Sequence, residues 1–203
     1  GIHGFRLDAI KHIDSFFMGN FIRDIMAKYG EDFYVFGEFW NGDETANNDY
    51  LGSIDYRFDL VDVKLHHNLF DASRAGADYD LRNIFEQTLV KNHPKSAVTF
   101  VDNHDTQRGQ ALESTVEEWF KPAAYALILL REAGLPCIFY GDYYGIKGEF
   151  AQDSFQTVLD KLLDIRLNLA YGKQKDYFDD EHCIAWTRSG KDNEQPIAVI
   201  ISN

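Results

Sequence analysis

The stretch Ala97-Val98-Thr99-Phe100-Val101-Asp102-Asn103-His104-Asp105 decides the fold of this chain. Its first five residues are apolar or β-branched, which is typical of a buried strand. The next four are all polar, and placing them at a strand end costs free energy unless they contact a ligand or one another. An Asx-rich turn would also account for them. Residues 97–105 therefore predict a buried strand that ends either in a functional site or in a polar turn.

Two further apolar runs also end in a carboxylate. Gly4-Phe5-Arg6-Leu7-Asp8 and Phe36-Gly37-Glu38-Phe39-Trp40 each place an acidic residue just after a short strand-like segment, and a helix-like stretch follows. The C-terminal ends of successive strands meet at one face of a (β/α)8 barrel. Asp8, Glu38 and Asp105 could therefore share one pocket, and grouped carboxylates are the residues that cleave a glycosidic bond.

Strand-like and helix-like segments alternate along most of the chain, which predicts a parallel sheet or barrel. The sequence predicts strands over residues 1–8, 33–36, 54–58, 97–101 and 138–140. It predicts helices over residues 10–26, 61–70, 81–90, 116–132 and 155–169.

The pattern changes near residue 172. Residues 184–188 and 197–201 are strand-like and are joined by a polar turn over 189–195, as in a hairpin. We expect residues 1–172 to form the second half of a TIM (β/α)8 barrel, about strands 4 to 8. We expect residues 173–203 to begin an all-β C-terminal domain. A complete barrel needs about 250 residues, so the chain is expected to be a piece of a longer protein.

Composition narrows the classes of partner. The formal net charge is −13, with acidic residues spread along the chain, which argues against nucleic acid and anionic membranes as partners. No apolar run reaches the roughly 18 residues that a membrane span requires. Cys137 and Cys183 have neither a disulfide pattern nor metal-ligand spacing, and Cys137 is predicted to be a small buried residue. Two free thiols favour a reducing, cytoplasmic compartment over secretion, and the sequence assigns no compartment beyond this preference.

The residues around two of the carboxylates suggest different chemistry for each. Arg6 and Asp8 are two positions apart on a strand and so face the same side, and a neighbouring arginine favours the ionised carboxylate that a nucleophile needs. Alternatively, Arg6 and Asp8 could form an ion pair with a purely structural role. Glu38 lies between Gly37 and an aromatic pair, and such an apolar setting suits a general acid. Alternatively, the Glu38 carboxylate could simply complement the positive end of a helix dipole at a helix N-terminus.

Three blocks of the chain, residues 4–12, 36–40 and 100–105, resemble conserved blocks of the α-amylases, glycoside hydrolase family 13. Residues 105–107, 113–116, 119–122, 139–142, 171–172 and 176–179 resemble the bacterial liquefying-type enzymes in particular. The resemblance implies that Asp8 is the nucleophile, Glu38 the general acid/base and Asp105 the residue that stabilises the transition state. Such retaining enzymes hold the first two carboxyls roughly 5–5.5 Å apart.

The resemblance also implies residues that contact substrate. Arg6 would keep the nucleophile ionised, and His104 would grip sugar hydroxyls beside Asp105. Lys11 and His12 would contact sugars on the leaving-group side, and Trp40 would offer a stacking face.

Calcium is the cofactor that the resemblance implies. The backbone carbonyl of His12 would supply part of one structural site, with the other ligands outside this chain. A further site in some relatives would use the backbone at Tyr79. His182 stands where those relatives carry an aspartate, and an imidazole is a poor calcium ligand.

The resemblance implies that the intact protein is a glycosidase that hydrolyses internal α-1,4-glucosidic bonds of starch, glycogen or maltodextrins with retention. A maltooligosaccharide-forming amylase, a transglycosylase and a non-catalytic carbohydrate-binding fragment remain alternatives. For the 203-residue chain itself, an open half-barrel with exposed strand edges predicts little activity and a tendency to self-associate.

Overall fold

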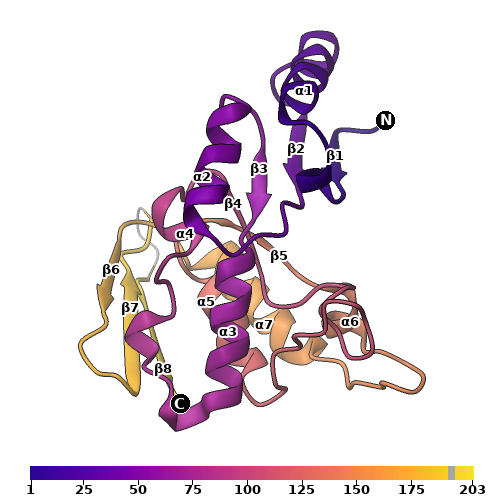
Figure 1. The fold of residues 1–203 in the computed structure, drawn as a ribbon. Helices are drawn as coiled ribbons and strands as arrows, with labels where there is room; N and C mark the ends of the chain where they lie inside the picture. The colour runs from indigo at the N-terminus through magenta and orange to yellow at the C-terminus, as the bar shows by residue number, and fades with distance from the viewer. Residues whose placement is uncertain (192–194) are drawn as a thin grey trace.

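A computed structural model describes residues 1–191 and 195–203. Its main element is a parallel sheet in the order β1-β2-β3-β4-β5 (Figure 1). The strands are β1 (Gly4–Leu7), β2 (Tyr34–Gly37), β3 (Asp59–Val61), β4 (Ala97–Phe100) and β5 (Leu135–Cys137). Each strand pairs in parallel with the next one along the chain. The carboxyl ends of all five strands therefore lie at the same end of the sheet.

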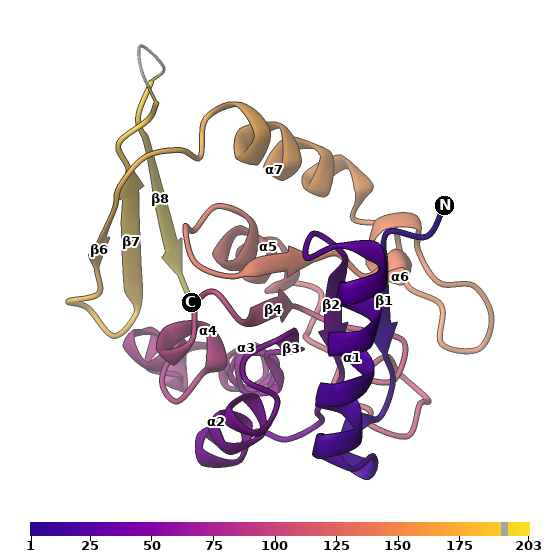
Figure 2. The ribbon, with the colours of Figure 1, turned by 90° about the horizontal axis from the view of Figure 1, so that it is seen from above.

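Helices connect these strands and lie around the outside of the sheet (Figure 2). The α-helices are α1 (Ser15–Tyr29), α2 (Glu44–Ser53), α3 (Val63–Ala75), α4 (Leu89–Asn92), α5 (Lys121–Leu129), α6 (Tyr140–Tyr144) and α7 (Gln156–Asn168). The short 3-10 helices in the described part of the chain are η1 (Ile10–His12), η2 (Gly76–Asp78) and η3 (Leu81–Asn83). None of the described helices is both long enough and apolar enough to cross a membrane.

Aspartates mark where the first three α-helices begin. The carboxylates of Asp14, Asp43 and Asp62 each accept a hydrogen bond from the backbone N–H three residues further on. These bonds satisfy donors that have no partner within the helix. The turn from each strand into its helix is thus encoded locally.

A second, antiparallel sheet has the order β6-β7-β8 and lies on the side of the molecule away from α1 (Figures 1 and 2). Its strands are β6 (Gln174–Tyr177), β7 (Cys183–Arg188) and β8 (Ile197–Ser202). The predicted polar turn over 189–195 includes residues 192–194, which lie outside the described residues. The predicted fold class, a half-barrel of parallel strands followed by a small antiparallel sheet, is confirmed.

Several predicted element boundaries are wrong. The strand expected at 138–140 is instead Leu135–Cys137, because Tyr140 already begins α6. The helix expected over 116–132 is only Lys121–Leu129. The strand expected over 54–58 is displaced to Asp59–Val61, since Asp55 and Tyr56 adopt positive φ. Residues 81–90 form η3 and then the start of α4 instead of one helix.

The prediction that Cys137 is buried is also wrong. The residue is exposed and lies on β5, which is an edge strand of the parallel sheet. An edge strand has a neighbour on one side only, so the apolar run of residues 135–140 does not produce the burial that a central strand would. The burial of Val98 and Phe100 on β4, which has strands on both sides, shows the contrast.

Candidate active site

The predicted carboxylates meet at the carboxyl end of the parallel sheet. Asp8 follows β1 directly and Glu38 follows β2 directly, and the register pairs Leu7 with Gly37. The Glu38 N–H donates to the Leu7 carbonyl at 2.8 Å, which places the two acidic residues side by side. Asp105 reaches the same end from the turn that follows β4.

A hollow of about 270 Å³ collects most of the predicted site residues. Its lining includes Asp8, Lys11, His12, Glu38, Trp40 and Asp105. Arg6 and His104 line an adjoining hollow of about 170 Å³, and Glu38 lines both. The structure therefore brings together all eight side chains that the sequence singled out, from three different strand ends.

Arg6 connects the first two carboxylates. One guanidinium nitrogen lies 2.6 Å from Asp8 Oδ1 and another lies 3.3 Å from Glu38 Oε2. Glu38 Oε2 also accepts the backbone N–H of Ala9 at 3.1 Å. The Glu38 side chain is only 7% exposed, whereas that of Asp8 is 69% exposed. The predicted contact between Arg6 and Asp8 is present, but the sequence did not reveal that the same arginine also reaches Glu38.

The polar residues after β4 form the polar turn that the sequence left open as one alternative. Asn103 Oδ1 accepts the backbone N–H groups of Asp105 and Thr106, each at 2.9 Å, which makes an Asx-type turn. His104 Nε2 lies 3.3 Å from Asp105 Oδ2. The turn therefore presents Asp105 to the hollow while satisfying its own backbone donors.

η1 and the segment after β2 line part of the hollow. The Lys11 ammonium donates to the Trp40 carbonyl at 3.2 Å. The Trp40 ring is half-buried, with its centroid 6.0 Å from the ring of His66 and 6.2 Å from that of Phe100. Part of the indole is thus used in packing, and the rest borders the hollow.

Sequence reasoning missed a buried ionic cluster beneath the turn. The Lys121 ammonium lies 2.9 Å from Asp102 Oδ2, contacts Asp142 Oδ1 and donates to Gln152 Oε1 at 2.9 Å. Burial raises the pKa of Asp102 to about 6, although Lys121 acts to lower it. A lysine at the start of an apolar helix gives no sequence signal of burial, because its partners lie after β4, on α6 and in the loop that follows α6.

His66 is a second buried polar residue that the sequence did not single out. Its ring nitrogens lie 2.6 Å from the Val101 carbonyl and 2.7 Å from Ser114 Oγ. Burial lowers the pKa of His66 to about 4, so the imidazole is neutral at physiological pH. Its ring also stacks on that of Phe100 of β4, with the centroids 5.1 Å apart.

The residues present fit only part of a calcium site. Calcium takes six to eight oxygen ligands, and the His12 carbonyl at the end of η1 could supply one. Within residues 1–191 and 195–203, no group of three or more histidine, cysteine, aspartate or glutamate side chains could hold a metal ion. At the further position, Asn203 Nδ2 donates to the carbonyls of Tyr79 and Gly76, each at 2.7 Å. A hydrogen-bond donor there does not fit a bound cation.

Comparison with known proteins gives consistent results. The profile described as "Alpha amylase, catalytic domain" matches residues 1–195. The chain is 48% identical over 190 residues to the glucan 1,4-alpha-maltohexaosidase of Bacillus sp. (strain 707), covering 94% of this chain and 36% of that protein. It is 44% identical over 191 residues to the α-amylase of Bacillus licheniformis, covering 93% of this chain and 37% of that protein. The chain thus spans little more than a third of these curated relatives.

A solved structure agrees with the fold. The crystal structure of an Anoxybacillus α-amylase superposes with a TM-score of 0.72 at 21% sequence identity, over 99% of this chain and 48% of that one. At this identity the likeness supports the fold alone.

Proposed function

Because the chain belongs to the α-amylase catalytic domain family, we propose that the intact protein is a retaining glycosidase that hydrolyses internal α-1,4-glucosidic bonds of starch, glycogen or maltodextrins. One observation carries the proposal: Asp8, Glu38 and Asp105, from three strand ends, line one hollow. A neutral glucan suits a chain of net charge −13, which would repel polyanions.

In this proposal the first two carboxylates divide the chemistry. Asp8, exposed and held by Arg6, attacks the anomeric carbon, while the buried Glu38 gives its proton to the glycosidic oxygen of the leaving sugar. Glu38 then takes a proton from water, whose oxygen attacks the same carbon and releases Asp8. Two displacements at one carbon return the original anomeric configuration.

The remaining residues bind and orient the glucan. Asp105 and His104 form hydrogen bonds with sugar hydroxyls, and these hydrogen bonds become stronger in the transition state. Lys11 and His12 line the hollow from η1 and contact the leaving-group side, and Trp40 packs against a sugar ring. We also propose that the His12 carbonyl is one ligand of a structural calcium ion that steadies η1, with the other ligands supplied from outside these residues.

The test of the proposal uses the full-length protein. Asp8→Asn and Glu38→Gln should each lower starch hydrolysis by at least about 10³-fold, because each removes a group that takes part in bond making. Asp55→Asn is the matched control, since that carboxylate is 80% exposed and lies outside the hollow. Wild-type activity in both site variants would overturn the assignment.

A maltooligosaccharide-forming enzyme is the second candidate. The relative at 48% identity is named for maltohexaose formation, which favours this reading. Chromatography of the early products distinguishes internal hydrolysis from the formation of one maltooligosaccharide. A broad set of oligosaccharides supports internal cleavage. A single short product from the first turnover onward supports release from chain ends. Transfer of glucosyl units to an added acceptor sugar would instead support a transglycosylase.

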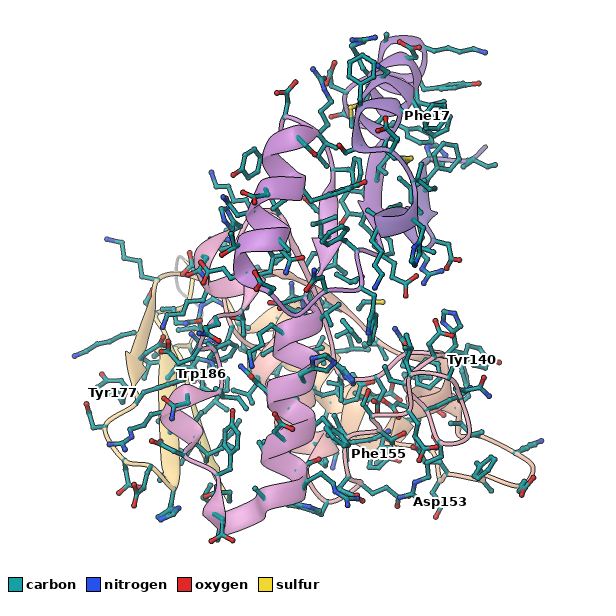
Figure 3. The ribbon with its side chains drawn as sticks, viewed as in Figure 1. Phe17, Tyr140, Asp153, Phe155, Tyr177 and Trp186 are labelled. Carbon is teal, nitrogen blue, oxygen red and sulfur yellow. The ribbon has the colours of Figure 1, made fainter. Side chains whose placement is uncertain are left out.

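The 203-residue chain alone is a different case, for which we propose weak or absent activity and self-association. On α1, Phe16 and Phe17 are 76% and 57% exposed, and Figure 3 labels Phe17 on this helix. β1 and β5 are also open edges of the sheet. Light scattering should show oligomers. A monomeric chain that hydrolyses starch at the full-length rate would contradict this, whereas a monomer that only binds glucan would support a carbohydrate-binding fragment.

A further inference from the structure

A buried hydroxyl helps to tie the turn that carries Asp105 to the protein interior. Thr106 Oγ1 donates to Asp102 Oδ1 at 3.0 Å and accepts the Asn103 N–H at 2.9 Å. Thr106 is fully buried. Because Asn103 and Thr106 flank the segment that contains Asp105, this hydroxyl joins the start and end of the turn to one carboxylate beneath it.

That carboxylate belongs to a firmly held group. Asp102 and Lys121 have side chains only 1% exposed, and their charged atoms are 2.9 Å apart. Lys121 on α5 also contacts Asp142 on α6, whose side chain is fully buried. Separating buried charges of opposite sign leaves each one unpaired at low dielectric, so such a cluster resists displacement. Asp102 therefore provides a fixed point beneath the turn.

Asp105 has few side-chain contacts of its own to hold it in place. Its carboxylate lies 3.3 Å from His104, a side chain that is itself 57% exposed. Its backbone is held more firmly, because its N–H donates to Asn103 Oδ1 at 2.9 Å and its carbonyl accepts from the Leu112 N–H at 3.2 Å. The position of the carboxylate therefore follows the backbone of the turn.

We propose that Thr106 is a positioning residue for Asp105, its hydroxyl transmitting the fixed position of the Lys121–Asp102–Asp142 cluster to the turn. This rests on the proposed function, in which Asp105 stabilises the transition state. Removing the hydroxyl lets the turn shift relative to Asp8 and Glu38. A displacement of about 1 Å at such a site lowers the catalytic rate by roughly 100-fold.

The experiment compares two hydroxyls on the same cluster in the full-length protein. Thr106→Val removes the one that holds the turn. Tyr125→Phe removes the one that donates to Asp142 Oδ2 at 2.5 Å, at the other end of the cluster. Both changes delete a buried hydrogen bond to a carboxylate, so both should lower the thermal midpoint. Only Thr106→Val should lower kcat, by about 10- to 100-fold with KM little changed, and Thr106→Ser should restore it.

Each outcome decides the inference. No loss of kcat in Thr106→Val would show that its hydroxyl contributes to stability alone. Equal losses of kcat in Thr106→Val and Tyr125→Phe would also overturn the inference, because the effect would then not depend on the hydroxyl that holds the turn. Should Thr106→Val not fold, Thr106→Cys replaces it, since a thiol hydrogen-bonds weakly in the same place, and an unchanged kcat there overturns the inference. Asp105→Asn separates the two proposals: full activity in that variant refutes the role of Asp105. Its inactivity together with an unaffected Thr106→Val refutes only the positioning role.

Discussion

Arg6 organises the site at the scale of a single residue. Its guanidinium contacts Asp8 and Glu38 together, so one side chain pairs with both carboxylates. A planar, always charged group can meet two acceptors from separate strands, which an ammonium group does poorly. In the proposed retaining mechanism, the cation also offsets the repulsion between the two carboxylates once Glu38 has given up its proton.

The buried side chain of His66 should make the free energy of unfolding depend on pH. Its pKa is lowered from 6.5 to about 4, so below pH 6.5 the unfolded chain binds a proton that the folded chain does not. The contribution of His66 to the free energy of unfolding is therefore complete above pH 6.5 and declines as the pH falls toward 4. The total decline is about 3 kcal/mol at most.

The measurement is the difference in free energy of unfolding between wild type and His66→Gln, by urea unfolding from pH 7 to pH 4. Taking the difference removes the opposite effect of Asp62 and Asp102, whose raised pKa values of about 6 favour the folded state as the pH falls. The advantage of the wild type should shrink across this range. A difference that does not change with pH would refute the assignment.

At the scale of elements, the close approach of β2 to η1 sets the position of Glu38. A Cβ atom on Gly37 would lie 2.4 Å from Ile10 Cδ1 and 3.0 Å from Phe58 Cε2. Both neighbours are buried, so neither can move freely. The glycine before Glu38 is therefore required by packing and not by an unusual backbone conformation.

Gly37→Ala should destabilise the protein by about 1–3 kcal/mol through overpacking, and should reduce activity because Glu38 moves with the strand. Ile10→Val removes the Cδ1 atom that the new methyl group would strike. The double variant should consequently be more stable than the sum of the two single changes predicts. Thermal unfolding of the four proteins measures this coupling, and strictly additive effects would contradict it.

At the scale of the whole molecule, one cluster joins the antiparallel sheet to the end of α5. Trp186 on β7 is fully buried, and its Nε1–H donates to the Leu130 carbonyl at the end of α5 at 3.4 Å (Figure 3). Arg131 lies over the rings of Phe85 and Trp186 and forms two hydrogen bonds with Asp176 of β6, at 2.9 and 2.8 Å. The antiparallel sheet is thus packed against the helical layer of the barrel.

Trp186→Ala should cost about 3–5 kcal/mol, because it leaves a large cavity at this junction. Ile200→Ala on β8 is the matched control, since Ile200 is 71% exposed and its loss should change stability little. Differential scanning calorimetry of the full-length protein compares them. Equal thermal midpoints for the two variants would show that the junction contributes little to stability.

The sequence predicted the parts of the fold that depend on local pattern. Strand-like runs that end in Asp8, Glu38 and Asp105 do end at one face, and the change from parallel to antiparallel strands after α7 is present. The sequence prediction failed where one apolar run allows a strand to begin and end at several places. In residues 135–140, β5 ends at Cys137 and α6 starts at Tyr140. Nothing local distinguishes those alternatives.

The sequence by itself determined that Asp8, Glu38 and the polar residues 102–105 follow strands, because each apolar run and the polar residues that end it are neighbours along the chain. Only the tertiary structure decided that Arg6 reaches Glu38, that Lys121 is buried between Asp102 and Asp142, and that Cys137 is exposed. Each of these depends on groups that lie far apart along the chain. Charge pairing and burial act through space, so they are settled only when the sheet brings those groups together.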